Sequence, residues 1–73
     1  MRSKKLAREL TRLNQGVKFE VSDYNPYTFE PWIDVRGAVV PLNTSLILPL
    51  KAKWHDKNHI EYKGKKILLI PLP

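Results

Sequence analysis

The chain has 73 residues and a formal net charge of +6 at pH 7, and its length fits a single domain (1–73). It has no cysteine, which excludes disulfides and thiolate metal sites. Hydrophobic residues make up 42% of it, enough for a small core. Its apolar runs are far shorter than the roughly 20 residues that cross a bilayer. No apolar signal-peptide segment follows the basic start, and we expect a cytoplasmic protein without a membrane contact.

The first predicted element is a helix over residues 1–16, and residues 17–73 form a β module. Leu6, Leu10 and Leu13 recur at the spacing of one helix face. Ser3 is the candidate N-cap, and the glycine at the end can take the left-handed conformation that stops a helix. The pattern predicts an amphipathic helix.

The opposite face of this helix is cationic. It carries Lys4, Lys5, Arg8 and Arg12. Residues 1–16 hold five cations and one acid, and residues 51–73 hold six cations and two acids. The middle, residues 17–50, holds two cations and four acids. Clustered like charges repel one another, so an acidic or polyanionic partner would stabilise both basic ends.

Alternation of apolar and polar residues predicts strands over 17–21 and 32–36. The run 46–48 is interrupted by Pro49 and reads as an edge or bent strand that residues 50–54 extend. The two regular strands bracket a loop that contains an Asn-Pro turn pair.

The clearest hairpin joins residues 60–62 to residues 66–70 through a turn at 63–65, and Pro71 and Pro73 are expected to end the pairing. One helix and four or five short strands predict an α+β fold. The strands form either a small SH3-like or OB-like barrel or an open antiparallel sheet under the helix.

The residues that could carry chemistry form no recognisable site. His55 and His59 have the spacing of two helical metal ligands, but they flank a predicted turn and lack a third donor. No nucleophile elbow or glycine-rich phosphate loop is present. We expect no enzyme activity, no metal, no cofactor and no small-molecule substrate.

Aromatic side chains offer an alternative, because exposed rings can stack on unpaired bases. The candidates are Tyr24, Tyr27, Phe29, Trp32, Trp54 and Tyr62. A domain this small needs its large side chains for the core, so burial of the tryptophans is favoured.

The chain resembles the small regulators that lytic phages make to bind host RNA polymerase. The resemblance lies in its length, in the basic amphipathic stretch over residues 2–10 and in the cysteine-free strand module with its basic hairpin. The resemblance implies an inhibitor of initiation or an antiterminator near the RNA exit channel. The helix would provide the partner-binding residues, which are Arg2, Lys4, Lys5, Leu6, Arg8, Leu10 and Arg12. The leucines would anchor the partner only if the sheet does not already bury them. A second basic patch would comprise Lys51, Lys53, Lys63, Lys65 and Lys66.

Two other functions stay open. The chain could be a stand-alone RNA- or DNA-binding module, or a phage structural connector in which residues 66–70 pair with a partner's strand. The polymerase hypothesis predicts that deleting residues 1–14 leaves a folded strand module that no longer captures polymerase.

Overall fold

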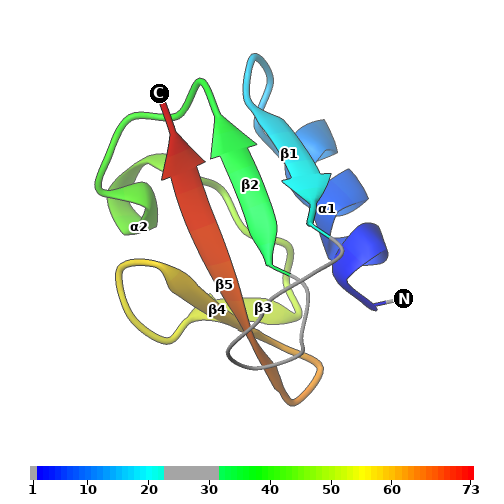
Figure 1. The fold of residues 1–73 in the computed structure, drawn as a ribbon. Coiled ribbons are helices and arrows are strands. Elements are labelled where there is room, and N and C mark those ends of the chain that lie inside the picture. The colour runs from blue at the N-terminus through cyan, green and yellow to red at the C-terminus, as the bar shows by residue number, and fades with distance from the viewer. Residues whose placement is uncertain (1, 23–31) are drawn as a thin grey trace.

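A computed structural model of the chain describes residues 2–22 and 32–73. Its elements in chain order are α1 (Arg2–Leu13), β1 (Lys18–Val21), β2 (Ile33–Arg36), α2 (Leu42–Ser45), β3 (Ala52–Trp54), β4 (His59–Tyr62) and β5 (Lys65–Leu72). The predicted α+β class is confirmed. The strands lie in the order β1-β2-β5-β4-β3, and α1 lies beside β1 (Figure 1).

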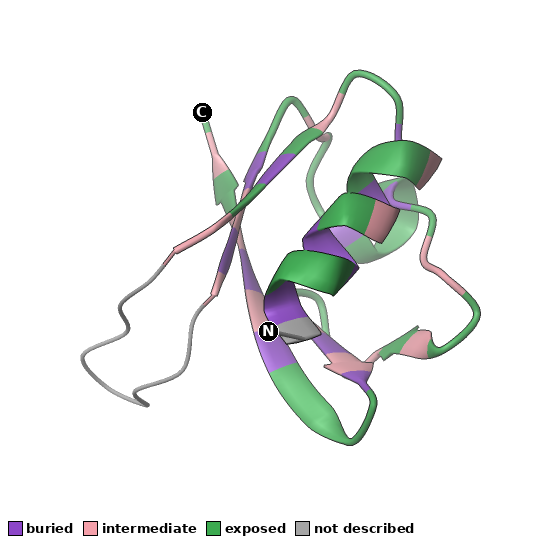
Figure 2. Ribbon diagram, turned by 90° about the vertical axis from the view of Figure 1, so that its right-hand side faces the viewer, coloured by how far each residue is buried: buried purple, intermediate pink, exposed green. Residues whose placement is uncertain are grey.

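Helix α1 ends earlier than the predicted residue 16. Ser3 lies inside its first turn and is buried, so the predicted N-cap was wrong. Leu6 and Leu10 are fully buried, as expected for the apolar face of an amphipathic helix. Gly16 has φ +85°, the left-handed conformation expected after the last turn. The helix thus packs on the sheet, with its buried face inward and its exposed face outward (Figure 2).

The sheet is open rather than a closed barrel, because its edges β1 and β3 do not pair with each other. Three strand pairs are antiparallel, but β2 and β5 run parallel. The predicted antiparallel sheet is thus confirmed for three of its four strand pairs, and the β2–β5 pair is the exception. The chain leaves β2, passes through α2, β3 and β4, and returns along β2 as β5, so the parallel pair depends on a long connection.

Strand β5 continues through Pro71 to Leu72, although proline was expected to stop it. The backbone N–H of Leu69 donates to the carbonyl of Asn58 at 2.7 Å, just before β4 begins. Backbone groups alternate sides along a strand, so the nitrogen of Pro71 points to the β4 side, as the N–H of Leu69 does. At Pro71 this side lies beyond His59, where β4 begins, and no strand of the described chain is paired there. A proline there removes no ladder hydrogen bond, and its Cα still pairs with Val35 of β2.

The predicted strand over 46–48 does not form, and strand structure begins only at β3. The single-turn helix α2 precedes this segment, and the N–H of Leu46 donates to the carbonyl of Leu42. The next residue, Ile47, bonds to the side chain of Asn14 instead of to a neighbouring strand. The segment is therefore held as an irregular crossing between α2 and β3.

The predicted hairpin is confirmed, with a two-residue turn of Lys63 and Gly64. Their φ angles are +51° and +77°, the pair of positive values that a type I′ turn requires. Strand β5 consequently starts at Lys65, one residue earlier than expected.

One core joins the helix to both halves of the sheet. Its fully buried large residues are Leu6, Leu10, Ile33, Val35, Leu42, Ile60, Tyr62 and Leu69. These residues come from α1, α2, β2, β4 and β5, so the helix contributes to the core that the strands share. Neither helix in the described part of the chain is long and apolar enough to cross a membrane.

Candidate binding face

The exposed side of α1 carries four cations in a row along the helix. We call this surface the basic ridge, and it consists of Lys4, Lys5, Arg8 and Arg12. All four residues are exposed, as the helical periodicity predicted. Arg2 begins the helix, but its side chain lies outside what the structure describes.

The two leucines proposed as partner anchors do not belong to this surface. Leu6 and Leu10 have no exposed area, and they pack in the core with residues of the sheet. The condition for their partner-binding role is therefore not met. Anything that binds α1 from outside contacts the cations and their neighbours, and the leucines instead fix how the helix lies on the sheet.

The five lysines of the second basic patch are all exposed, and Lys51, Lys53 and Lys63 line a shallow groove of about 340 Å³ together with Glu61. On one face of the sheet, Lys53 and Lys66 pair in register with Glu61, and the Lys53 Nζ lies 3.8 Å from Glu61 Oε2. Lys51 and Lys63 also line a groove beside the helix. Lys65 pairs with the buried Tyr62 at the start of β5.

A groove of about 370 Å³ separates α1 from the hairpin and brings the two basic regions together. Its four cations are Lys5, Arg12, Lys51 and Lys63, and its one carboxylate is that of Glu9. Its apolar lining comprises Leu13, Leu48, Pro49, Leu50 and Tyr62. We call it the helix–hairpin groove. It combines an apolar wall with a surplus of positive charge, which suits an acidic segment that also carries an apolar side chain.

Asn14 joins the two segments beside this groove, since it follows the lining residue Leu13 and its partner Ile47 precedes the lining residue Leu48. Its Nδ2 donates to the carbonyl of Ile47 at 2.9 Å, and its Oδ1 accepts from the N–H of Ile47 at 2.7 Å. The sequence did not lead us to expect this long-range role of Asn14. The signal was its spacing of four after Leu10, which places a polar residue on the buried stripe of the helix.

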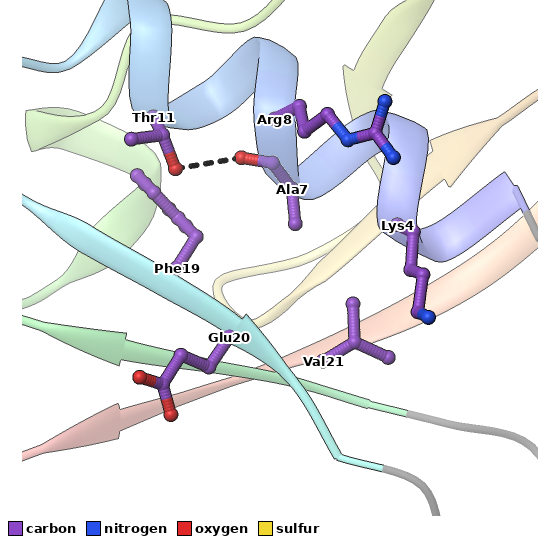
Figure 3. Close-up of a pocket in the computed structure, with 7 residues that line it drawn as sticks. All are labelled: Lys4, Ala7, Arg8, Thr11, Phe19, Glu20 and Val21. Carbon is purple, nitrogen blue, oxygen red and sulfur yellow. Dashed lines mark hydrogen bonds between the residues drawn. The ribbon is translucent and has the colours of Figure 1, made fainter.

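A second groove, of about 500 Å³, lies on the other side of the basic ridge, between α1 and β1 (Figure 3). Its helix side is formed by Lys4, Ala7, Arg8 and Thr11, and its strand side by Phe19, Glu20 and Val21. The Thr11 hydroxyl donates to the carbonyl of Ala7 at 2.8 Å and so is held against the helix. We call this cavity the edge groove.

The histidines lie at the turn between β3 and β4, away from both grooves. The Nδ1 of His59 lies 2.8 Å and 2.9 Å from the two carboxylate oxygens of Asp56. Hydrogen bonding from the Asn58 N–H and then from His59 holds the pKa of Asp56 below its ordinary value of 3.8. In residues 2–22 and 32–73, no three His, Asp or Glu side chains gather as metal ligands.

The aromatic residues in the described ranges offer little exposed ring surface. Phe19 and Tyr62 are buried, and Trp32 and Trp54 are half-buried. The indole N–H of Trp32 donates to Asp34 at 2.9 Å. Burial of these rings favours a core role over base stacking. The other candidates for stacking, Tyr24, Tyr27 and Phe29, lie outside the described residues.

Comparisons with protein-family models, curated proteins and solved structures found no match. The function that the resemblance to phage regulators implies therefore stays a prediction. The basic ridge and the two grooves that flank it are the surfaces of the described chain that best suit a binding partner.

Proposed function

We propose that the chain is a non-enzymatic transcription regulator that docks on bacterial RNA polymerase, where it inhibits initiation or acts as an antiterminator near the RNA exit channel. The observation that carries the proposal is the basic ridge and its continuation across the helix–hairpin groove into the lysines of the hairpin. The polymerase enters through the resemblance described above. Such a regulator would act in the bacterial cytoplasm.

The charges of the ridge support binding rather than internal stabilisation. In the part of the chain that the structure describes, ion pairs form between Lys18 and Glu20 and between Lys53 and Glu61, for example, and the ridge cations take part in none of the described ones. The four cations, which occupy three successive turns of one helix, repel one another by a few tenths of a kcal/mol per close pair. An acidic partner surface would relieve that repulsion and would accelerate the encounter.

The helix–hairpin groove adds the apolar contact that a protein interface needs. The side chain of Leu50 is fully exposed at its rim, next to Lys51. An apolar centre with a polar, solvent-accessible rim is the usual composition of a protein interface. This groove replaces the buried Leu6 and Leu10 as the source of apolar anchoring.

Binding of bare RNA or DNA is the second candidate, and the surplus of cations favours it. Its log affinity would fall with log salt by about 0.7–0.9 per phosphate contact. The buried or half-buried state of the described aromatic rings argues against base stacking. The connector hypothesis loses its structural basis, because β5 lies centrally in the sheet and pairs with β4 and then with β2.

The test is affinity capture from a bacterial lysate with the full chain, with and without nuclease. Capture of polymerase subunits that survives nuclease supports the proposal. Capture that nuclease abolishes supports the nucleic-acid candidate, and recovery of no polymerase subunit from either lysate refutes the proposal.

A further inference from the structure

The hydrogen-bond pattern of β1 leaves half of its backbone groups facing outward. The N–H of Ser22, just after β1, donates to the carbonyl of Trp32, just before β2, at 2.8 Å. Ser22 and Trp32 are therefore a hydrogen-bonded pair of the ladder, and the backbone groups of Ser22 point toward β2. In an antiparallel ladder such pairs alternate with pairs that make no hydrogen bond. The N–H and C=O groups of Phe19 and Val21, the intervening positions, therefore point away from β2 toward the outer edge.

That outer edge borders the edge groove. Strand β1 is the terminal strand of the sheet, with β2 as its neighbour. The groove is lined by Phe19 and Val21, whose side chains share one face of the strand, and by Glu20, which points to the other face (Figure 3). A cavity that contacts residues of both faces of a strand lies along its edge. The outward backbone groups thus face a preformed space.

The charges around this space are predominantly positive. Lys4 and Arg8 of the basic ridge extend along the helix side. The single carboxylate, Glu20, forms an ion pair with Lys18 at 2.9 Å, and this hydrogen bond and charge hold its pKa below the ordinary value. The two helix cations therefore determine the charge that an occupant meets.

We propose that the edge groove binds an extended acidic segment of a partner protein, which adds to β1 as a further strand. The outward groups of Phe19 and Val21 would supply the backbone hydrogen bonds, and Lys4 and Arg8 would pair with carboxylates of the incoming segment. The buried side chains of Ala7 and Phe19 form an apolar floor for its inward-facing residues. This contact is separate from the helix–hairpin groove and does not require that the partner be polymerase.

The other edge of the sheet and a second copy of the chain are poorer choices. Strand β3 has only three residues, with Lys51 directly before it and Lys53 at its centre, and short edge strands that carry lysines resist strand addition. A symmetric pairing of two β1 strands through Phe19 and Val21 would place Glu20 opposite Glu20. It would also join two chains that each carry a net charge of +6.

The experiment titrates two eight-residue peptides, one alternating Glu and Val and one alternating Lys and Val, into the full ¹⁵N-labelled chain. The acidic peptide should produce saturable NMR shifts and at least tenfold slower amide exchange at Phe19 and Val21. Equal effects from the basic peptide, or shifts confined to the helix–hairpin groove, would overturn the proposal. The same shifts from an oligonucleotide would also overturn it, since they would assign the groove to phosphate.

Matched variants locate the contact. The double variant Lys4→Gln/Arg8→Gln should weaken binding of the acidic peptide at least fivefold. The matched double variant Lys5→Gln/Arg12→Gln should change that binding less than twofold. Val21→Pro removes an outward N–H that β2 does not use, so the fold persists while binding falls at least tenfold. Unchanged binding by this folded variant would refute strand addition. Peptide binding at β1 without capture of polymerase would refute the proposed function alone.

Discussion

The side chain of Asn14 pairs with the backbone of Ile47 as a neighbouring strand would. Its amide donates to the carbonyl of Ile47 and accepts from the N–H of Ile47, while a further hydrogen bond joins it to Leu10 of its own helix. This clamp ties the end of α1 to the segment that leads into β3. It therefore holds Leu13 and Leu48, the chain neighbours of Asn14 and Ile47 that line the helix–hairpin groove, close to each other.

Replacing Asn14 with alanine should destabilise the fold by about 2–4 kcal/mol, because three hydrogen bonds are lost and the backbone groups of Ile47 are left unpaired. Urea unfolding measures the change. Gln15→Ala, at the exposed next position, is the control and should shift the free energy of unfolding by no more than about 0.5 kcal/mol. Equal effects of the two substitutions would show that the clamp does not stabilise the fold.

Deletion of residues 1–14 should unfold the strand module, contrary to the prediction from sequence that this module is independent. The helix contributes Leu6 and Leu10 to the shared core. Leu10→Ala alone should destabilise the protein by about 2–5 kcal/mol. Circular dichroism and amide NMR dispersion of the truncated chain provide the measurement. A dispersed spectrum with cooperative thermal unfolding would show that the strands fold without the helix.

Gly37→Ala should be more destabilising than Gly64→Ala by at least about 1 kcal/mol. Both glycines have positive φ angles, +86° and +77°, so both substitutions incur the roughly 1–2 kcal/mol cost of a left-handed residue. At Gly37 the added Cβ would also lie 2.9 Å from the carbonyl oxygen of Gly16, whereas open space surrounds Gly64. Chemical denaturation of both variants compares them, and a smaller loss at Gly37 would contradict the close approach.

Asp56→Asn should flatten the dependence of stability on pH below about pH 4. The pKa of Asp56 is lowered in the folded chain, so the ionised carboxylate stabilises the fold above its unfolded pKa. That contribution is lost as the pH falls through the folded pKa. The asparagine keeps an acceptor for the Asn58 and His59 N–H groups but does not titrate. Urea unfolding between pH 2 and pH 6 tests this, and superimposable curves for both proteins would contradict it.

Local patterns predicted the elements whose stabilising contacts are close in sequence. The spacing of Leu6 and Leu10 predicted α1, and alternation around Gly64 predicted the hairpin. The course of residues 46–50 could not be predicted, because Ile47 pairs with a side chain 33 positions away. The parallel pairing of β2 with β5 likewise depends on a long connection that leaves no local signal.

The candidate site was predictable only in part, for the same reason. Helical periodicity placed Lys4, Lys5, Arg8 and Arg12 on one exposed face, and the structure confirms their exposure. Nothing local shows that Lys51 and Lys63 border the same groove as Arg12, since this depends on the packing of the hairpin beside the helix. The clamp that Asn14 makes beside that groove was not predicted, although its position on the buried helical stripe was visible.

The central claim is that the basic ridge docks this chain on an acidic protein partner, with polymerase as the proposed one. The most direct measurement uses purified bacterial RNA polymerase and two double variants. It compares the affinity of polymerase for the ridge variant, which combines Arg8→Gln and Arg12→Gln, with its affinity for a control that carries the same change of charge. The control is Arg36→Gln with Lys57→Gln, two exposed positions outside both grooves. We predict that the ridge variant binds at least tenfold more weakly at moderate salt and that the control stays within twofold of the parent chain. Equal affinities for both variants would contradict the claim.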